Sequence, residues 1–67
     1  MKANILKGEF IKSNLTHKQV ADHLGINQST LSQKLSGARD FSRKECDELR
    51  KLLHLDDKTF MEIFFQN

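Results

Sequence analysis

The chain has 67 residues, one Cys and a net charge of +2, so it is long enough for one small domain and too short for two. A single Cys excludes an intramolecular disulfide, and no apolar run approaches the roughly 20 residues that a membrane-spanning helix requires. With no Pro, Trp or Tyr and only three Gly, the composition favours a soluble all-helical domain in the reducing cytoplasm.

The first helix is predicted over roughly residues 2–13. Ala3, Leu6 and Phe10 lie at helical spacing, so one face of this segment is apolar and should pack into the core. Asn14 follows, and asparagine tolerates the left-handed backbone conformation that often ends a helix.

The second helix is predicted to begin after Thr16. A threonine followed three residues later by Gln19 is a capping-box pattern, in which each side chain hydrogen-bonds to the backbone N–H of the other residue. Gly25 ends this helix, because glycine readily adopts the positive φ that a tight turn requires. The residues expected to face the core are Val20, Ala21, Leu24 and, in the turn, Ile26.

The third helix is predicted over roughly residues 28–36, capped by Asn27 and ended by Gly37. Leu31 and Leu35 are four residues apart and therefore face the core together. The same spacing leaves a row of amide and hydroxyl side chains facing outward, namely Gln28, Ser29, Ser32 and Gln33.

A loop over residues 38–41 should turn Phe41 toward the core. Ser42 and Glu45 repeat the capping-box pattern at the start of a fourth helix, which ends near His54. The apolar stripe of this helix consists of Cys46, Leu49, Leu52 and Leu53. A packing role is therefore expected for the cysteine, since the sequence places no base beside its thiol.

The fifth helix is predicted to be capped by Asp56 or Asp57, a simpler role for these residues than an acid/base pair. Its apolar residues, five within six positions, are more than one buried stripe can hide. Two interpretations stay open: the helix closes the small core, or it presents an apolar surface to a second protein chain. The residues of that candidate protein interface are Phe60, Met61, Phe64 and Phe65, with Ile63 on the core side.

Residues 15–37, LTHKQVADHLGINQSTLSQKLSG, are thus two short helices joined by a tight turn. Ala21 is small enough to let the helices cross closely, and the turn holds the N-terminal end of the second helix away from the body. Proteins use a polar helix held in this way to contact base edges in the DNA major groove. Glutamine pairs with two groups on the adenine edge, and serine serves several bases. Sequence-specific DNA binding is therefore the leading hypothesis.

The segment resembles the helix-turn-helix of the Cro/C1-type family, also called the xenobiotic-response-element family, which includes bacteriophage repressors and their antagonists. The resemblance implies one compact, all-α, five-helix, lambda-repressor-like domain over residues 1–67, with its helix-turn-helix at about 16–36. KLSGARDF and Phe64-Phe65 resemble a phage-borne subgroup of small regulators. The matching residues are Leu15-Thr16, Gln19, Val20-Ala21, Leu24-Gly25-Ile26, Ser29-Thr30-Leu31-Ser32 and Gly37, continuing through Ser42 and Leu49 to Leu55.

The resemblance also implies which side chains contact DNA. Base contacts are expected from Gln28, Ser29 and Gln33, with Ser32 added. Phosphate contacts are expected at or beside five positions: His17, Asn27, Lys34, Arg39 and Arg43. The chain departs from the family pattern at His17, where a glutamine is common, and at Leu35-Ser36, where Glu-Arg is common.

The expected function is therefore regulation of transcription in a bacterial host cell, at the nucleoid, by binding a double-stranded DNA operator. Residues 1–15 carry +2, residues 16–40 carry +1 and residues 41–67 carry −1. Because this basic excess is modest, phosphate attraction alone gives weak, salt-sensitive binding, and a homodimer or a second DNA-bound protein is expected.

The alternative is an antirepressor, which would form a heterodimer with a phage repressor by contacting its DNA-binding domain. No catalytic residue, cofactor, small-molecule ligand or membrane partner is expected, because the chain has no glycine-rich phosphate loop and is too short to enclose a substrate. No metal is expected either, since His17, His23 and His54 lack metal-ligand spacing.

Overall fold

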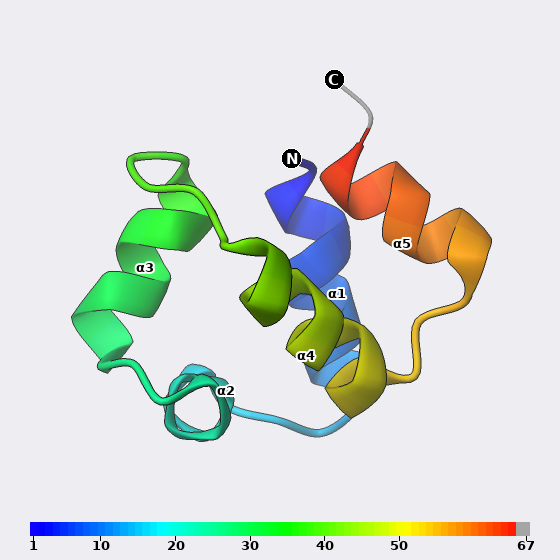
Figure 1. Cartoon of the computed structure of the whole chain (residues 1–67). Coiled ribbons are helices and arrows are strands. Elements are labelled where there is room, and N and C mark those ends of the chain that lie inside the picture. The colour runs from blue at the N-terminus through cyan, green and yellow to red at the C-terminus, as the bar shows by residue number, and fades with distance from the viewer. Residues whose placement is uncertain (66–67) are drawn as a thin grey trace.

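The computed structural model describes residues 1–65, a compact domain with five helices and no strand within that range (Figure 1). Each helix lies where the sequence predicts it, although the first is one residue shorter at either end. None of the described helices has the length and apolar character needed to cross a membrane. The helices are α1 (Ala3–Lys12), α2 (His17–Leu24), α3 (Gln28–Ser36), α4 (Arg43–Leu53) and α5 (Asp57–Phe64).

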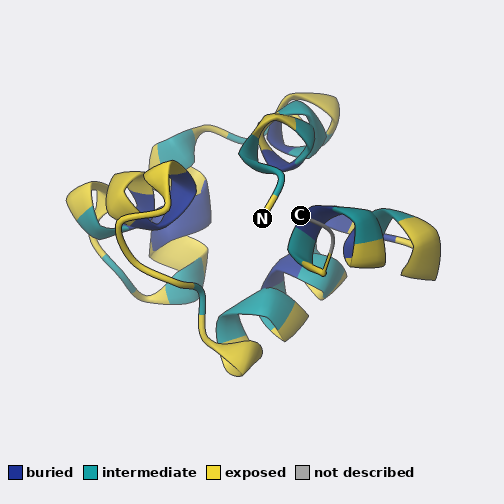
Figure 2. Cartoon of the chain, turned by 90° about the horizontal axis from the view of Figure 1, so that it is seen from above, coloured by how far each residue is buried: buried dark blue, intermediate teal, exposed yellow. Residues whose placement is uncertain are grey.

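The helices surround a single core, with α2 and α3 on one side of the α1–α4 centre and α5 on the other (Figure 1). Seen from above, α3 and the loop that follows it lie at the edge of the molecule, whereas the N-terminus lies beside the end of α5 (Figure 2). The backbone N–H of Lys2 donates to the carbonyl of Ile63 at 2.8 Å. The C-terminal helix therefore closes the core against the start of the chain.

Local hydrogen bonds explain where the helices begin. Both predicted capping boxes are formed, one by Thr16 with Gln19 and the other by Ser42 with Glu45. Each places a side-chain oxygen on a backbone N–H that has no partner inside its helix. The single-residue caps are Asn27 for α3 and Asp56, rather than Asp57, for α5.

The apolar faces predicted for the five helices meet in this core. The largest fully buried side chains are Phe10, Leu6, Leu31, Leu49, Ile63 and Val20. Several residues predicted to be internal are only partly buried and pack around the core, namely Leu24, Ile26, Phe41, Cys46 and Leu52, and Ala3 is also only partly buried. The prediction omitted Leu55, which is buried because His54 adopts a left-handed conformation with φ of 54° that turns the chain back toward the core.

Two glycines form a matched pair for measuring what the turn between α2 and α3 requires. Gly25 has a φ of +72°, whereas Gly8 lies inside α1, and at either position an added Cβ would meet no atom within 4 Å apart from the adjacent residues and the helix's own backbone. Gly25→Ala should therefore lower the free energy of unfolding by about 1 kcal/mol through backbone strain alone. Gly8→Ala should raise it by up to about 1 kcal/mol, because alanine is the better helix former.

Urea denaturation followed by circular dichroism measures both glycine variants. Equal changes in the two unfolding free energies would show that position 25, despite its left-handed backbone, does not require glycine.

Candidate nucleic-acid interface

The turn between α2 and α3 sets the position of the candidate interface. Gly25 ends α2 in the left-handed region, and the side chain of Asn27 accepts a hydrogen bond from the backbone N–H of Thr30 at 2.7 Å. Ala21 and Leu31 are almost fully buried, at 1% and 0% exposure, where the two helices pack. The N-terminal end of α3 consequently lies at an outer corner of the domain, beside α2 (Figure 1).

The outer face of α3 carries the four residues predicted to contact bases. All four side chains are exposed, and none makes a hydrogen bond within residues 1–65. Their donors and acceptors are therefore free to pair with another molecule. These residues are Gln28, Ser29, Ser32 and Gln33.

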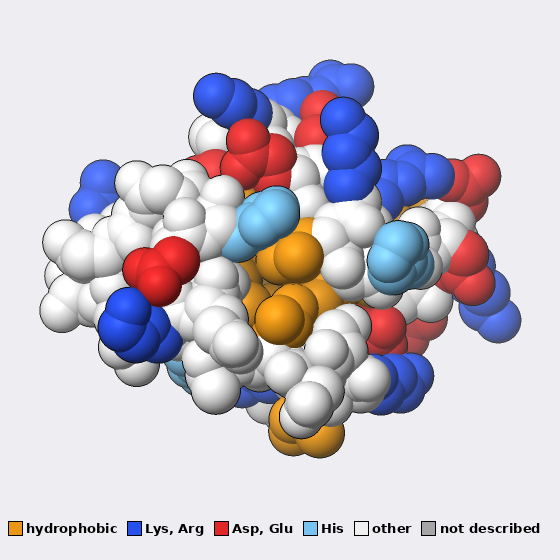
Figure 3. All heavy atoms as spheres, turned by 90° about the horizontal axis from the view of Figure 1, so that it is seen from below, with side chains coloured by type: hydrophobic (Ala, Val, Ile, Leu, Met, Phe, Trp, Pro, Cys, Tyr) orange, Lys and Arg blue, Asp and Glu red, His pale blue; other side chains and the backbone are white. Residues whose placement is uncertain are grey.

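The surface around α2 and the foot of α3 has no dominant sign of charge. Viewed from below, basic and acidic side chains are intermixed toward the edge of this face, and the part over α3 is mostly neutral (Figure 3). A small group of hydrophobic side chains is visible at its centre, between two histidines (Figure 3). Specific hydrogen bonds, rather than a strong positive potential, are what this face offers to a partner.

The residues predicted to contact phosphate have different surroundings. Arg39 and Arg43 are exposed and make no ion pair within the described residues. Asn27 is exposed, but its side-chain oxygen is engaged in capping α3. The ring of His17 is half-buried and lies edge-on to that of Phe10, with centroids 5.6 Å apart.

Lys34 does not fit the expected phosphate contact. Only 8% of this residue is exposed. Its ammonium donates to a carboxylate oxygen of Glu45 at 2.6 Å and to the backbone carbonyl of Asp40 at 3.2 Å, and it lies 5.8 Å from the centre of the Phe41 ring. The charge of Lys34 is thus used inside the domain, where it ties α3 to the start of α4.

Glu45 belongs to both the ion pair and the capping box of α4. Burial favours its protonated form, but the hydrogen bond from Lys34 and that from the Ser42 backbone N–H outweigh burial and lower the pKa of the Glu45 carboxyl. The carboxylate therefore stays ionised and links α3, the intervening loop and α4.

The thiol of Cys46 has a packing role. Burial raises the pKa of the Cys46 thiol, and the negative charges of Asp47 and Glu45 raise it further, so this thiol is not activated as a nucleophile. Within residues 1–65, no three His, Cys, Asp or Glu side chains are grouped closely enough to hold a metal ion.

The aromatic C-terminal segment is divided between the two interpretations that the sequence left open. Phe60 is buried and Phe64 is half-buried, so part of the segment closes the core. Met61 and Phe65 are 50% and 64% exposed. The exposed pair leaves an apolar surface beside the packed rings.

Comparison of the chain with known protein families, characterised proteins and solved structures gives no significant match. A function for the chain therefore has to be inferred from the geometry and chemistry of its own residues.

Acid should weaken the domain through Glu45. Because the folded-state pKa lies below the ordinary value of 4.5, ionised Glu45 stabilises the fold above that pH, and this contribution is lost as the pH falls through the folded-state pKa. Glu45→Gln preserves a residue type suited to the capping box but cannot ionise. The variant should be less stable than the wild type at pH 7, and the difference should shrink as the pH falls below the ordinary value of 4.5.

Urea midpoints measured across this pH range test the expectation for Glu45. The hydrogen bond from the Thr59 backbone N–H lowers the pKa of Asp56 as well. Asp56 is present in both proteins, so the difference in stability between wild type and variant isolates Glu45. A constant difference at every pH would show that ionisation of Glu45 contributes nothing.

Proposed function

We propose that the protein is a sequence-specific DNA-binding regulator of transcription. In this proposal α2 and α3 form a lambda-repressor-like helix-turn-helix, and α3 enters the major groove of a double-stranded operator. The observation that carries the proposal is the exposed row Gln28, Ser29, Ser32 and Gln33, which has no hydrogen-bond partner within residues 1–65. Leu31 and Leu35 anchor the opposite side of the helix in the core.

The dimensions and chemistry of α3 suit this role. Its nine residues span about 13.5 Å, and the major groove, about 12 Å wide, admits one helix. The amide of Gln28 offers a donor and an acceptor, the combination that pairs with the major-groove edge of adenine. Ser29 and Ser32 can serve several bases and adapt to the neighbouring positions.

Phosphate contacts would flank this reading helix. Arg39 and Arg43 follow α3 in the chain, whereas His17 and Asn27 lie at the starts of α2 and α3. With a net charge of only +2, few phosphates can be neutralised, so affinity from this source is small and falls with salt. Base contacts therefore have to supply a large share of the affinity, and the operator complex requires a homodimer or another DNA-bound protein.

Gln28→Ala tests base contact directly. Loss of a bidentate pair should weaken binding to the preferred site by about 1–3 kcal/mol and relax the preference at one base position. Asn4→Ala is the matched control, because it removes an exposed amide from α1 instead of α3. Selection of bound sites from random DNA, followed by fluorescence anisotropy on the selected site, measures both effects. An equal loss on random DNA for Gln28→Ala would argue against base recognition.

The exposed apolar residues Met61 and Phe65 favour a second candidate function. An antirepressor would bind the DNA-binding domain of a phage repressor through protein contacts instead of binding DNA. Gel shifts with the operator, the repressor and this chain separate the two functions. A direct DNA binder retards the operator by itself, whereas an antirepressor changes only the shift caused by the repressor.

A further inference from the structure

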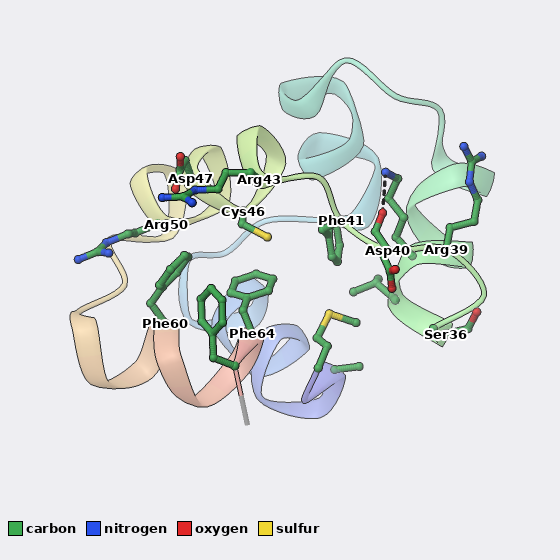
Figure 4. Close-up of a pocket in the computed structure, with 16 residues that line it drawn as sticks. Ser36, Arg39, Asp40, Phe41, Arg43, Cys46, Asp47, Arg50, Phe60 and Phe64 are labelled. Carbon is green, nitrogen blue, oxygen red and sulfur yellow. Dashed lines mark hydrogen bonds between the residues drawn. The ribbon is translucent and has the colours of Figure 1, made fainter. Parts of the chain in front are cut away.

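The helix that carries the candidate base contacts contains a single basic residue and no acidic one. In α3, QSTLSQKLS, that residue is Lys34. Its ammonium donates to a carboxylate oxygen of Glu45 at 2.6 Å and to the backbone carbonyl of Asp40 at 3.2 Å. Lys34 also lines a cavity of about 850 Å³ between α3, α4 and α5, whereas none of the four candidate base-contacting residues lines it (Figure 4). The charge of α3 is therefore turned away from its outer face.

The neighbouring helix adds no unpaired Lys or Arg to this surface. α2, HKQVADHL, contains one such residue, Lys18, whose ammonium lies 3.1 Å from a carboxylate oxygen of Asp22. The surface over α3 is accordingly mostly neutral (Figure 3). In the major groove the commonest specific contact is made by Arg or Lys, which donate to O6 and N7 of guanine. α2 and α3 thus lack an unpaired side chain of the type that usually recognises guanine.

Amides are what the outer face of α3 offers instead. Gln28 and Gln33 are exposed, and neither side chain makes a hydrogen bond within residues 1–65. Adenine presents a donor, the N6 amino group, beside an acceptor, N7, whereas guanine presents two acceptors. Each glutamine can therefore pair with adenine through its oxygen and its nitrogen together. On guanine the amide oxygen finds no donor.

The spacing of the two amides fits one short stretch of DNA. Gln28 and Gln33 lie five positions apart, which is a rise of about 7.5 Å along an α-helix. Successive base pairs rise by about 3.4 Å, so this distance covers about two steps. Ser29 and Ser32 lie between the two glutamines in the chain and are exposed as well. Because hydroxyls serve several bases, the intervening position tolerates more than one base pair.

We propose that the half-site is read at two adenines about two base pairs apart, and at no guanine. The inference rests on the DNA-binding function proposed above and specifies the DNA that this function requires. Arg39 and Arg43 are exposed, make no ion pair within residues 1–65 and remain for phosphate. Arg39 extends from the loop after α3, away from the cavity (Figure 4). Charge then holds the domain on DNA, while uncharged amides select the sequence.

Base analogues in the half-site selected from random DNA test which atoms are read. 7-Deazaadenine removes the N7 acceptor, and N6-methyladenine covers the major-groove donor, although both still pair with thymine. Either analogue at one of the two adenines removes one hydrogen bond. Binding of the full chain, measured by fluorescence anisotropy, should therefore weaken about 2- to 10-fold. 7-Deazaguanine in the same half-site should leave the affinity unchanged.

An inosine·cytosine pair separates base reading from DNA shape. Inosine lacks the N2 amino group of guanine, so this pair has the minor groove of A·T but the major-groove edge of G·C. At either adenine position it should weaken binding about 5- to 150-fold, as much as guanine·cytosine does. Binding that tolerates inosine·cytosine would place the preference in the width of the minor groove and overturn the inference.

Arginine substitutions give a change of preference that a loss of folding cannot imitate. Gln28→Arg and Gln33→Arg should each convert one adenine of the selected half-site to guanine and leave the other adenine in place. Asn4→Arg is the matched control, since it replaces an exposed amide on α1 by the same cation. The control should strengthen binding to all sequences without changing the selected bases. A shift to guanine in the control variant would contradict the assignment of the two glutamines.

The adenine half-site and the proposed DNA-binding function fail in different ways. Selection of one sequence in which 7-deazaguanine abolishes binding overturns the adenine half-site and leaves the function in place. Selection of no preferred sequence overturns both.

Discussion

The ion pair between Lys34 and Glu45 determines how α3 is held against the rest of the domain. It restrains the C-terminal half of α3, with its charged atoms 2.6 Å apart, while Leu31, fully buried in the core, restrains the half nearer the N-terminal end. A helix of nine residues is marginal by itself in water and depends on its contacts with the body. Because both halves are fixed, the polar row on its outer face keeps one direction, which is a requirement for any specific contact through that row.

The partly buried ion pair between Lys34 and Glu45 is weak evidence of added stability. Taking both charges out of water is costly, and an apolar pair of the same shape is often as stable or more so. Here the Glu45 carboxylate also accepts the backbone N–H of Ser42 at 2.8 Å, so one group both starts α4 and anchors α3. We infer that the pair specifies the angle between these helices, because apolar side chains could slide past one another whereas the ammonium and carboxylate meet in one arrangement.

The sequence predicts features that depend on neighbouring residues and misses those that depend on distant ones. The capping boxes and the glycine at the end of α2 follow from residue types only a few positions apart. The family resemblance places Lys34 at or beside a phosphate contact, whereas in the structure its ammonium is held by Glu45, a residue 11 positions further on. Leu55 was missed because burying it requires a left-handed histidine, His54, where glycine or asparagine is usual. The outward direction of Gln28 and its neighbours is confirmed, whereas their contact with bases stays a prediction, because exposure does not specify the ligand.

The proposed operator complex with a homodimer would give DNA binding and pairing of the chains a thermodynamic relation. In the proposed function, a single copy with a net charge of +2 gains little from phosphates, so its affinity for one half-site would be small. Joining two copies makes the second contact intramolecular, which multiplies the affinity without any new contact to bases. By linkage, DNA with two half-sites must strengthen pairing of the chains by the same factor by which pairing strengthens DNA binding. In the proposed function, a dimer that is weak in free solution would therefore be sufficient, because the operator itself would favour assembly.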